Sequence, residues 1–200
     1  KLLFEEIPGV SPRISFNIPC LHISSSFCKH ICSYSPTLSM EKKSFDQLFM
    51  ELAVNLASKS HCIKRHVGAV LTKDTRIISI GYNGPPAGTH NCDEKWPESG
   101  CERDSKGGCS LAIHAEQNAL LYAVKNNSSV EGATLYVTLS PCLACARIIL
   151  TMGVKKVIYH KSYAAYKKLD KDEGVDFLLQ FGVEVAAYKG DISPVQDTLI

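Results

Sequence analysis

Two short motifs, 25 residues apart in the sequence, supply one imidazole and two thiols. The first, Ile-His-Ala-Glu, contains His114 and Glu116, and the second, Pro-Cys-Leu-Ala-Cys, contains Cys142 and Cys145. One histidine and two cysteines hold a zinc ion with its fourth position open, as catalytic zinc sites do. Glu116 then lies beside that open position, where a proton shuttle is needed. The fold therefore has to bring these two motifs together.

Both motifs are expected at the beginnings of helices. Residues 114–125 fit one helix by their apolar spacing. Ser140 is predicted to N-cap a second helix, which has Pro141 at its first position and runs to about Met152. Both cysteines of the second motif then project from one face of the first turn, where the helix dipole favours thiolates.

Strands and helices alternate through the rest of the regular sequence. Further helices are predicted at 44–58 and 174–181, and strands at 67–71, 76–81, 134–139, 154–160 and 183–188. This order predicts an α/β fold, a three-layer α/β/α sandwich with a central mixed five-stranded sheet. The polar segment 89–110 is expected to be a long loop that is functional or held in place.

Composition narrows the class of protein. The 45% hydrophobic content of 200 residues suits one globular domain with an appendage. A net charge of +2 argues against nucleic acid and membrane surfaces as partners, and no apolar run approaches the ~20 residues that cross a bilayer. Nine cysteines fit either secreted disulfides or metal binding by reduced thiols; their spacing favours the latter, in a reducing, cytoplasmic compartment.

Residues 1–39 differ from the rest of the chain. They contain four prolines and many serines, and no acidic residue stands between Glu6 and Glu41. We expect this segment to be poorly ordered, with translation starting at Met40 and one domain over residues 40–200. A targeting peptide is the alternative, which the near absence of arginine disfavours.

The chain resembles the zinc nucleobase deaminases, whose signature is H-x-E followed by P-C-x-x-C. Within them it resembles the deoxycytidylate (dCMP) deaminases of phage and bacterial type, over nearly all of residues 44–188. The stretch Gly-Tyr-Asn-Gly-Pro-Pro-Ala-Gly at 81–88 narrows the resemblance to that family. It implies a cytidine deaminase-like fold and hydrolysis of dCMP to dUMP and ammonia, which supplies thymidylate synthesis. In the implied chemistry zinc makes water acidic, and Glu116 carries the proton from the water to the leaving ammonia.

The resemblance also implies further site residues. The expected substrate-binding residues are Asn83, Ala115, Ser140 and Tyr163. The regulators dCTP (activator) and dTTP (inhibitor), with Mg²⁺ on their phosphates, are expected at Gly81, Tyr82, Asn83, Gly84 and Gly88. The family resemblance further implies a homo-hexamer.

Four more cysteines suggest a second metal ion. Cys62, Cys92, Cys101 and Cys109 stand where related bacterial sequences carry cysteines, and four thiolates close a structural zinc site. Such an ion would pin the 89–110 loop to the segment before Val67. Free thiols are the alternative, and His61 or His90 is an alternative ligand.

Other functions share part of this pattern. A tRNA adenosine deaminase would need a basic surface, and a riboflavin-pathway pyrimidine deaminase would lack the Gly-Tyr-Asn-Gly stretch. A deaminase of dCTP remains open. A non-catalytic zinc module has no use for the carboxylate of Glu116.

Overall fold

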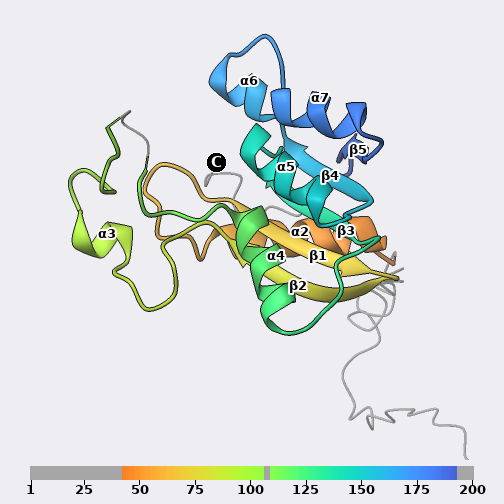
Figure 1. The fold of residues 1–200 in the computed structure, drawn as a ribbon, viewed down its shortest axis with the longest axis horizontal. Helices are drawn as coiled ribbons and strands as arrows, with labels where there is room; N and C mark the ends of the chain where they lie inside the picture. Colours follow the sequence, from red (N-terminus) through yellow and green to blue (C-terminus); the bar gives the residue numbers. More distant parts are fainter. Residues whose placement is uncertain (1–41, 106–108, 193–200) are drawn as a thin grey trace, which may run out of the picture. The chain divides into compact units, whose positions relative to one another are not determined.

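The computed structural model describes residues 42–105 and 109–192, which form one mixed sheet with helices on both faces (Figure 1). The expected features of residues 1–39, including a start at Met40, lie outside the described residues. Among the described helices, none is long and apolar enough to cross a membrane.

The sheet has five strands in the order β2-β1-β3-β4-β5. Their bounds are β1 (Gly68–Lys73), β2 (Arg76–Tyr82), β3 (Thr134–Leu139), β4 (Lys156–Lys161) and β5 (Glu184–Ala187). β1 pairs antiparallel with β2 and β3, whereas β4 lies parallel to both β3 and β5. The tight β1–β2 turn has positive φ angles at Asp74 (48°) and Thr75 (63°), the backbone of a two-residue hairpin. The predicted mixed five-stranded sheet is confirmed.

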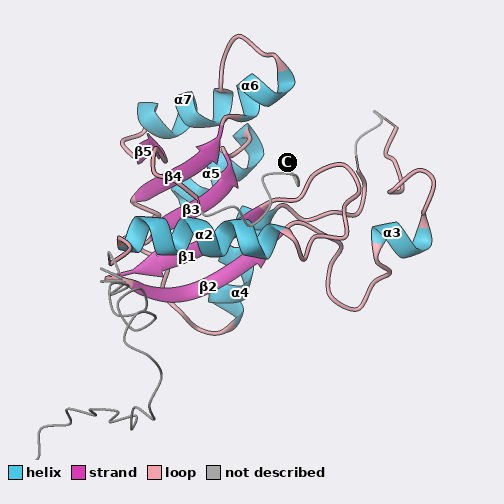
Figure 2. Cartoon of the chain, turned by 180° about the vertical axis from the view of Figure 1, so that it is seen from behind, coloured by secondary structure: helices cyan, strands magenta, loops and turns pink. Residues whose placement is uncertain are grey.

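Helices cover both faces of this sheet. The longer ones are α2 (Phe45–Ala57), α4 (Ala115–Lys125), α5 (Leu143–Thr151) and α7 (Glu173–Gln180). α2 is the described helix that packs on one face, where Phe49 and Met50 join a buried cluster with Val70 and Tyr136 of the sheet. α4, α5 and α7 share the larger core on the other face. Figure 2 shows α2 in front of the sheet and α4 behind it, which confirms the three layers.

Two glycines let helices lie directly on the strands. A Cβ on Gly68 would stand 1.9 Å from the carbonyl oxygen of Ala53 in α2, and a Cβ on Gly81 would stand 2.3 Å from that of Ala115 in α4. Real Cβ atoms do not approach backbone so closely. Gly81 therefore fixes the first turn of α4, which follows His114, against the sheet.

Two short helices were not predicted: α3 (Cys92–Lys95), inside the expected 89–110 loop, and α6 (Tyr163–Lys167) after β4. Helices of this length have too few residues to show an apolar pattern in the sequence. They are also not stable by themselves, so tertiary contacts determine whether they form. α6 matters for function because it begins with Tyr163.

Candidate active site

The fold brings the three predicted metal ligands to one point. His114 is the N-cap residue of α4, Cys142 is that of α5, and Cys145 lies in the first turn of α5. The Nδ1 atom of His114 lies 3.5 Å from the Sγ of Cys142 and 3.3 Å from the Sγ of Cys145. Their ligand atoms all lie within 4.8 Å of one another. Two helix N-termini thus converge on the site, as expected.

The predicted capping of α5 by Ser140 is wrong. α5 begins at Leu143, and Cys142 has the extended backbone of an N-cap residue (φ −70°, ψ 165°). The Ser140 hydroxyl instead donates a hydrogen bond to Asp172 Oδ2 at 2.6 Å and accepts one from the Tyr163 backbone N–H at 2.7 Å. Because distant partners occupy this hydroxyl, it is not available to cap the helix.

The chemistry of these side chains fits zinc. A hydrogen bond from Cys145, and to a smaller extent one from His114, lower the pKa of Cys142 to about 4 although burial raises it. The hydrogen bond with Cys142 also raises the pKa of His114 above its usual value. Two cysteine sulfurs, which bind zinc as thiolates, and an imidazole that face one another are the donors that zinc takes in deaminase sites. His114, Cys142 and Cys145 are therefore suited to hold the ion.

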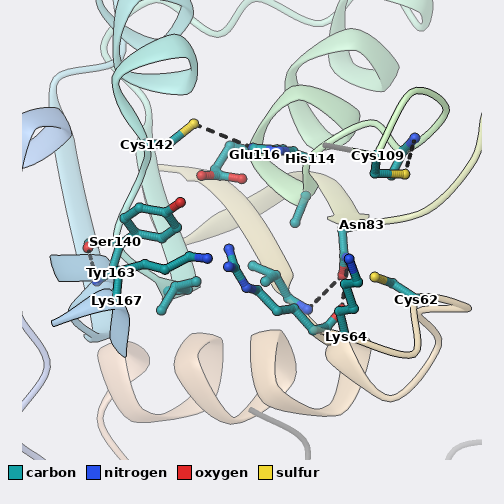
Figure 3. A pocket seen from close by; sticks show the side chains of 15 residues that line it. Cys62, Lys64, Asn83, Cys109, His114, Glu116, Ser140, Cys142, Tyr163 and Lys167 are labelled. Atoms are coloured by element: carbon teal, nitrogen blue, oxygen red, sulfur yellow. Dashed lines mark hydrogen bonds between the residues drawn. The ribbon is translucent and has the colours of Figure 1, made fainter. Parts of the chain in front are cut away.

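Glu116 is the buried acid of the site. It is the second residue of α4 and only 4% exposed. Burial raises the pKa of its carboxyl to about 7, against the opposing effect of His114. Figure 3 shows the carboxylate near Cys142 and facing the pocket. A buried carboxyl group of this pKa exchanges protons readily near neutral pH.

The site opens into a pocket of about 320 Å³. It is lined by all four residues that were expected to bind substrate (Asn83, Ala115, Ser140 and Tyr163), together with His114, Glu116 and Cys142. These come from the segment after β2, the turn between β3 and α5, the N-terminus of α4, and α6 (Figure 3). The space suits a small ligand that reaches the metal ligands with one end.

Asn83 is tied to the backbone beside the pocket. Its Oδ1 accepts a hydrogen bond from the Val67 N–H at 2.7 Å, and its Nδ2 donates to the Arg65 carbonyl at 2.9 Å. The Ser60 hydroxyl donates to the Asn83 carbonyl at 2.7 Å. This buried amide therefore fixes the shape of the segment that carries Arg65.

The remaining residues of the expected effector turn lie outside the pocket lining. Gly84 exchanges two backbone hydrogen bonds with Ile113, at 3.1 and 2.8 Å, directly before His114. Gly88 has a φ of +88°, which suits glycine. Gly81 and Tyr82 belong to β2. The turn is thus joined to the segment that presents His114.

Sequence reasoning missed three cations in the pocket lining, Lys64, Arg65 and Lys167. The Arg65 guanidinium lies over the rings of Tyr163 (5.3 Å) and Tyr166 (4.8 Å), which hold it by cation–π contacts. Figure 3 shows Lys167 extending into the pocket from the side of Tyr163. The adjacent Lys64 and Arg65 were visible in the sequence, but a net charge of only +2 concealed this local cluster.

Two of the four other predicted zinc ligands, Cys62 and Cys109, line the pocket. The other two, Cys92 and Cys101, are buried. Burial, together with the neighbouring charge of Cys109 and the other two thiols, raises the pKa of Cys92 to about 11. Within the described parts of the chain, however, no three of these four sulfurs lie within 4.8 Å of one another, whereas ligand atoms of His61, Asp93 and Glu94 do.

Comparisons with known proteins point to one family. Residues 43–161 match the family model for the cytidine and deoxycytidylate deaminase zinc-binding region. The chain is 37% identical to deoxycytidylate deaminase of Enterobacteria phage T2, over 68% of this chain and 88% of that one. It is 43% identical to deoxycytidylate deaminase of Schizosaccharomyces pombe over 61% of this chain, but spans only 38% of the yeast protein.

Solved structures agree with these relatives. The crystal structure of dCMP deaminase from the cyanophage S-TIM5, in complex with dCMP and dUMP, is 35% identical to this chain. The match covers 74% of this chain and 99% of the cyanophage chain, with a TM-score of 0.62.

Proposed function

Because the chain belongs to the cytidine and deoxycytidylate deaminase family, within its deoxycytidylate deaminase branch, we propose that it hydrolyses dCMP to dUMP and ammonia. The observation that carries this proposal is the convergence of His114, Cys142 and Cys145 beside the buried carboxyl of Glu116 at one end of a pocket. The product dUMP would supply thymidylate synthesis.

The proposed reaction exchanges one amino group for one oxygen. His114, Cys142 and Cys145 would hold the zinc ion, which would supply a Lewis acid that lowers the pKa of water toward neutrality. Glu116 accepts a proton from the attacking water, whose oxygen bonds to the ring carbon bearing the exocyclic amine. The same carboxyl then returns the proton to the amine nitrogen, so that the C–N bond breaks and ammonia leaves.

The cations of the pocket favour a nucleotide over a nucleoside. Lys64, Arg65 and Lys167 line the same pocket as the metal ligands, and phosphate oxygens are natural partners for such groups. Tyr163 and Tyr166 restrain the Arg65 side chain, which reduces the entropy lost when it binds an anion. We therefore assign the 5′-phosphate of dCMP to this group of cations.

Arg65→Ala should lower kcat/KM for dCMP by about 10- to 100-fold, the effect of losing one charge-assisted hydrogen bond. The kcat/KM for deoxycytidine, which has no phosphate, should stay unchanged. Lys155→Ala, an exposed lysine outside the pocket, is the matched control. Equal losses for dCMP and deoxycytidine would show that Arg65 does not bind the phosphate.

Ammonia release from a panel of substrates tests the proposed function. Full-length protein supplied with zinc is assayed with dCMP, dCTP, cytidine and an RNA hairpin at equal concentrations. We expect dCMP to be the preferred substrate. Preference for the hairpin would identify a tRNA-type deaminase, and no release from any substrate would identify a non-catalytic module.

A second, structural zinc ion is also proposed, held by Cys62, Cys92, Cys101 and Cys109. Support comes from the neighbouring thiols and from the hydrogen bond between the Cys101 and Cys109 side chains. His61, which lies 3.0 Å from Asp93, is an alternative ligand. Such an ion would attach the loop carrying Cys109 to the segment before β1.

We expect two zinc equivalents per chain by elemental analysis, falling to one in a Cys92→Ser/Cys101→Ser variant. The double variant should also unfold at a lower temperature, because the loop loses its metal anchor. A single equivalent in the parent protein would disprove the second site.

Regulation is proposed on the family resemblance. In this proposal dCTP activates and dTTP inhibits the enzyme, and both bind at the turn 81–88 with Mg²⁺ on their phosphates. The protein is proposed to be a homo-hexamer in a reducing, cytoplasmic compartment. The hydrogen bonds between Gly84 and Ile113 support a link from this turn to His114. Rates of dUMP formation at low dCMP, with each effector added separately, would reveal both effects.

A further inference from the structure

Three separate segments of the chain meet at the side chain of Asp172. Its Oδ2 accepts hydrogen bonds from the Ser140 hydroxyl at 2.6 Å and from the Ser162 hydroxyl at 2.9 Å. Asp172 itself directly precedes α7 and is its N-cap residue. A carboxylate oxygen with two donors is a strong anchor, because hydrogen bonds to a charged group exceed neutral ones in strength.

Each of these segments carries part of the pocket. Ser140 lines the pocket and lies two residues before Cys142. Ser162 caps α6, where its hydroxyl accepts a hydrogen bond from the Ala165 N–H at 3.2 Å. α6 supplies Tyr163 and Lys167 to the pocket lining. Asp172 therefore connects the turn that presents a metal ligand to the wall that faces the substrate.

The carboxylate also sets the direction of the Ser140 hydroxyl. A hydroxyl has a single proton, and here it is donated to Asp172, so that a lone pair remains for the Tyr163 N–H at 2.7 Å. Without Asp172 the hydroxyl is free to rotate, and the Tyr163 amide loses a fixed acceptor. Asp172 thus controls the start of α6 through a relay of two hydrogen bonds.

The first turn of α7 is also fitted closely to the metal-ligand turn. A Cβ on Gly174 would stand 1.9 Å from the Pro141 carbonyl oxygen and 2.9 Å from the carbonyl carbon of Cys142. The glycine allows α7 to begin in direct contact with that turn. The place of Asp172 is therefore fixed relative to Cys142.

We propose that Asp172 is a positioning residue for the deamination, acting through Ser140 and Ser162 to hold α6 against the Cys142 turn. This inference rests on the proposed function. Tyr163 and Lys167 contact the substrate rather than the metal in that function. Loss of the Asp172 carboxylate should therefore raise KM more than it lowers kcat.

Asp172→Ala is expected to raise KM for dCMP by about 10- to 100-fold and change kcat by less than about threefold, as loss of charged hydrogen bonds predicts. Zinc content should not change. The Tyr163 amide should exchange with deuterium faster. Asp172→Asn, whose amide oxygen still accepts both hydroxyl protons, should recover much of the KM.

Asp176→Ala is the matched control, because it removes another carboxylate from the first turn of α7 without touching these serines. It should leave KM and Tyr163 exchange unchanged. Equal effects of the Asp172 and Asp176 variants, or an unchanged KM in folded Asp172→Ala, would overturn the proposal.

If Asp172→Ala fails to fold, Ser140→Ala gives the same test, because it breaks the relay and leaves the charge in place. It should accelerate Tyr163 exchange, and unchanged exchange would overturn the proposal. Absence of dUMP formation by the parent protein would instead refute the proposed function. The exchange measurement still tests the positioning role in that case.

Discussion

Glu116→Gln is expected to lose turnover of dCMP while retaining zinc. Glutamine has the shape of glutamate and fits the same buried position, but it cannot accept a proton from water and pass it to the amine. General acid–base catalysis contributes about 10²- to 10⁴-fold, and kcat should fall by at least that factor. Rates of dUMP formation, with zinc measured on the same samples, provide the comparison.

Glu184→Gln, at the exposed beginning of β5, is the control for loss of a carboxylate and should behave like the parent protein. Near-normal turnover in zinc-loaded Glu116→Gln would remove Glu116 from the proton transfer. Loss of zinc together with turnover would instead assign its main effect to the metal site.

Cys145→Ala is expected to lose both the catalytic zinc and the activity. Cys145 is fully buried, and its sulfur lies 3.3 Å from His114 Nδ1. Removal of one of three protein ligands leaves an imidazole and one thiolate, too few for a stable zinc site. Activity should fall at least as far as in Glu116→Gln.

Cys92→Ser separates this effect from a general loss of metal. It removes a buried thiol of the loop but none of the three catalytic ligands, so it should keep the catalytic zinc and measurable turnover. Full activity and full zinc content in Cys145→Ala would contradict the assigned ligand set.

The sequence was sufficient for the parts of the site that depend on short spacings. A histidine and a glutamate two residues apart, and two cysteines three residues apart, indicated helix N-termini that converge, and the structure has them there. The five strands were also recognisable, because runs such as Thr134–Leu139 are rich in β-branched residues.

Other features depend on partners that are distant in the sequence. Local capping rules assigned Ser140 to the helix that follows it, but its hydroxyl bonds to Asp172, 32 residues away. α6 has only five residues and is positioned by the same contacts, so no local pattern revealed it. Arg65 gains its place in the pocket from two tyrosines about one hundred residues later in the chain.

In the proposed reaction an oxygen atom from water replaces the amino group of dCMP, with zinc at His114, Cys142 and Cys145. Incubation of zinc-loaded protein with dCMP in ¹⁸O-labelled water, followed by mass spectrometry, tests this reaction. We predict dUMP that carries one ¹⁸O on its base and one ammonia per dUMP. Protein from which a chelator has removed the zinc should give no product. Absence of dUMP, or unlabelled dUMP, would show that the protein does not carry out this hydrolysis.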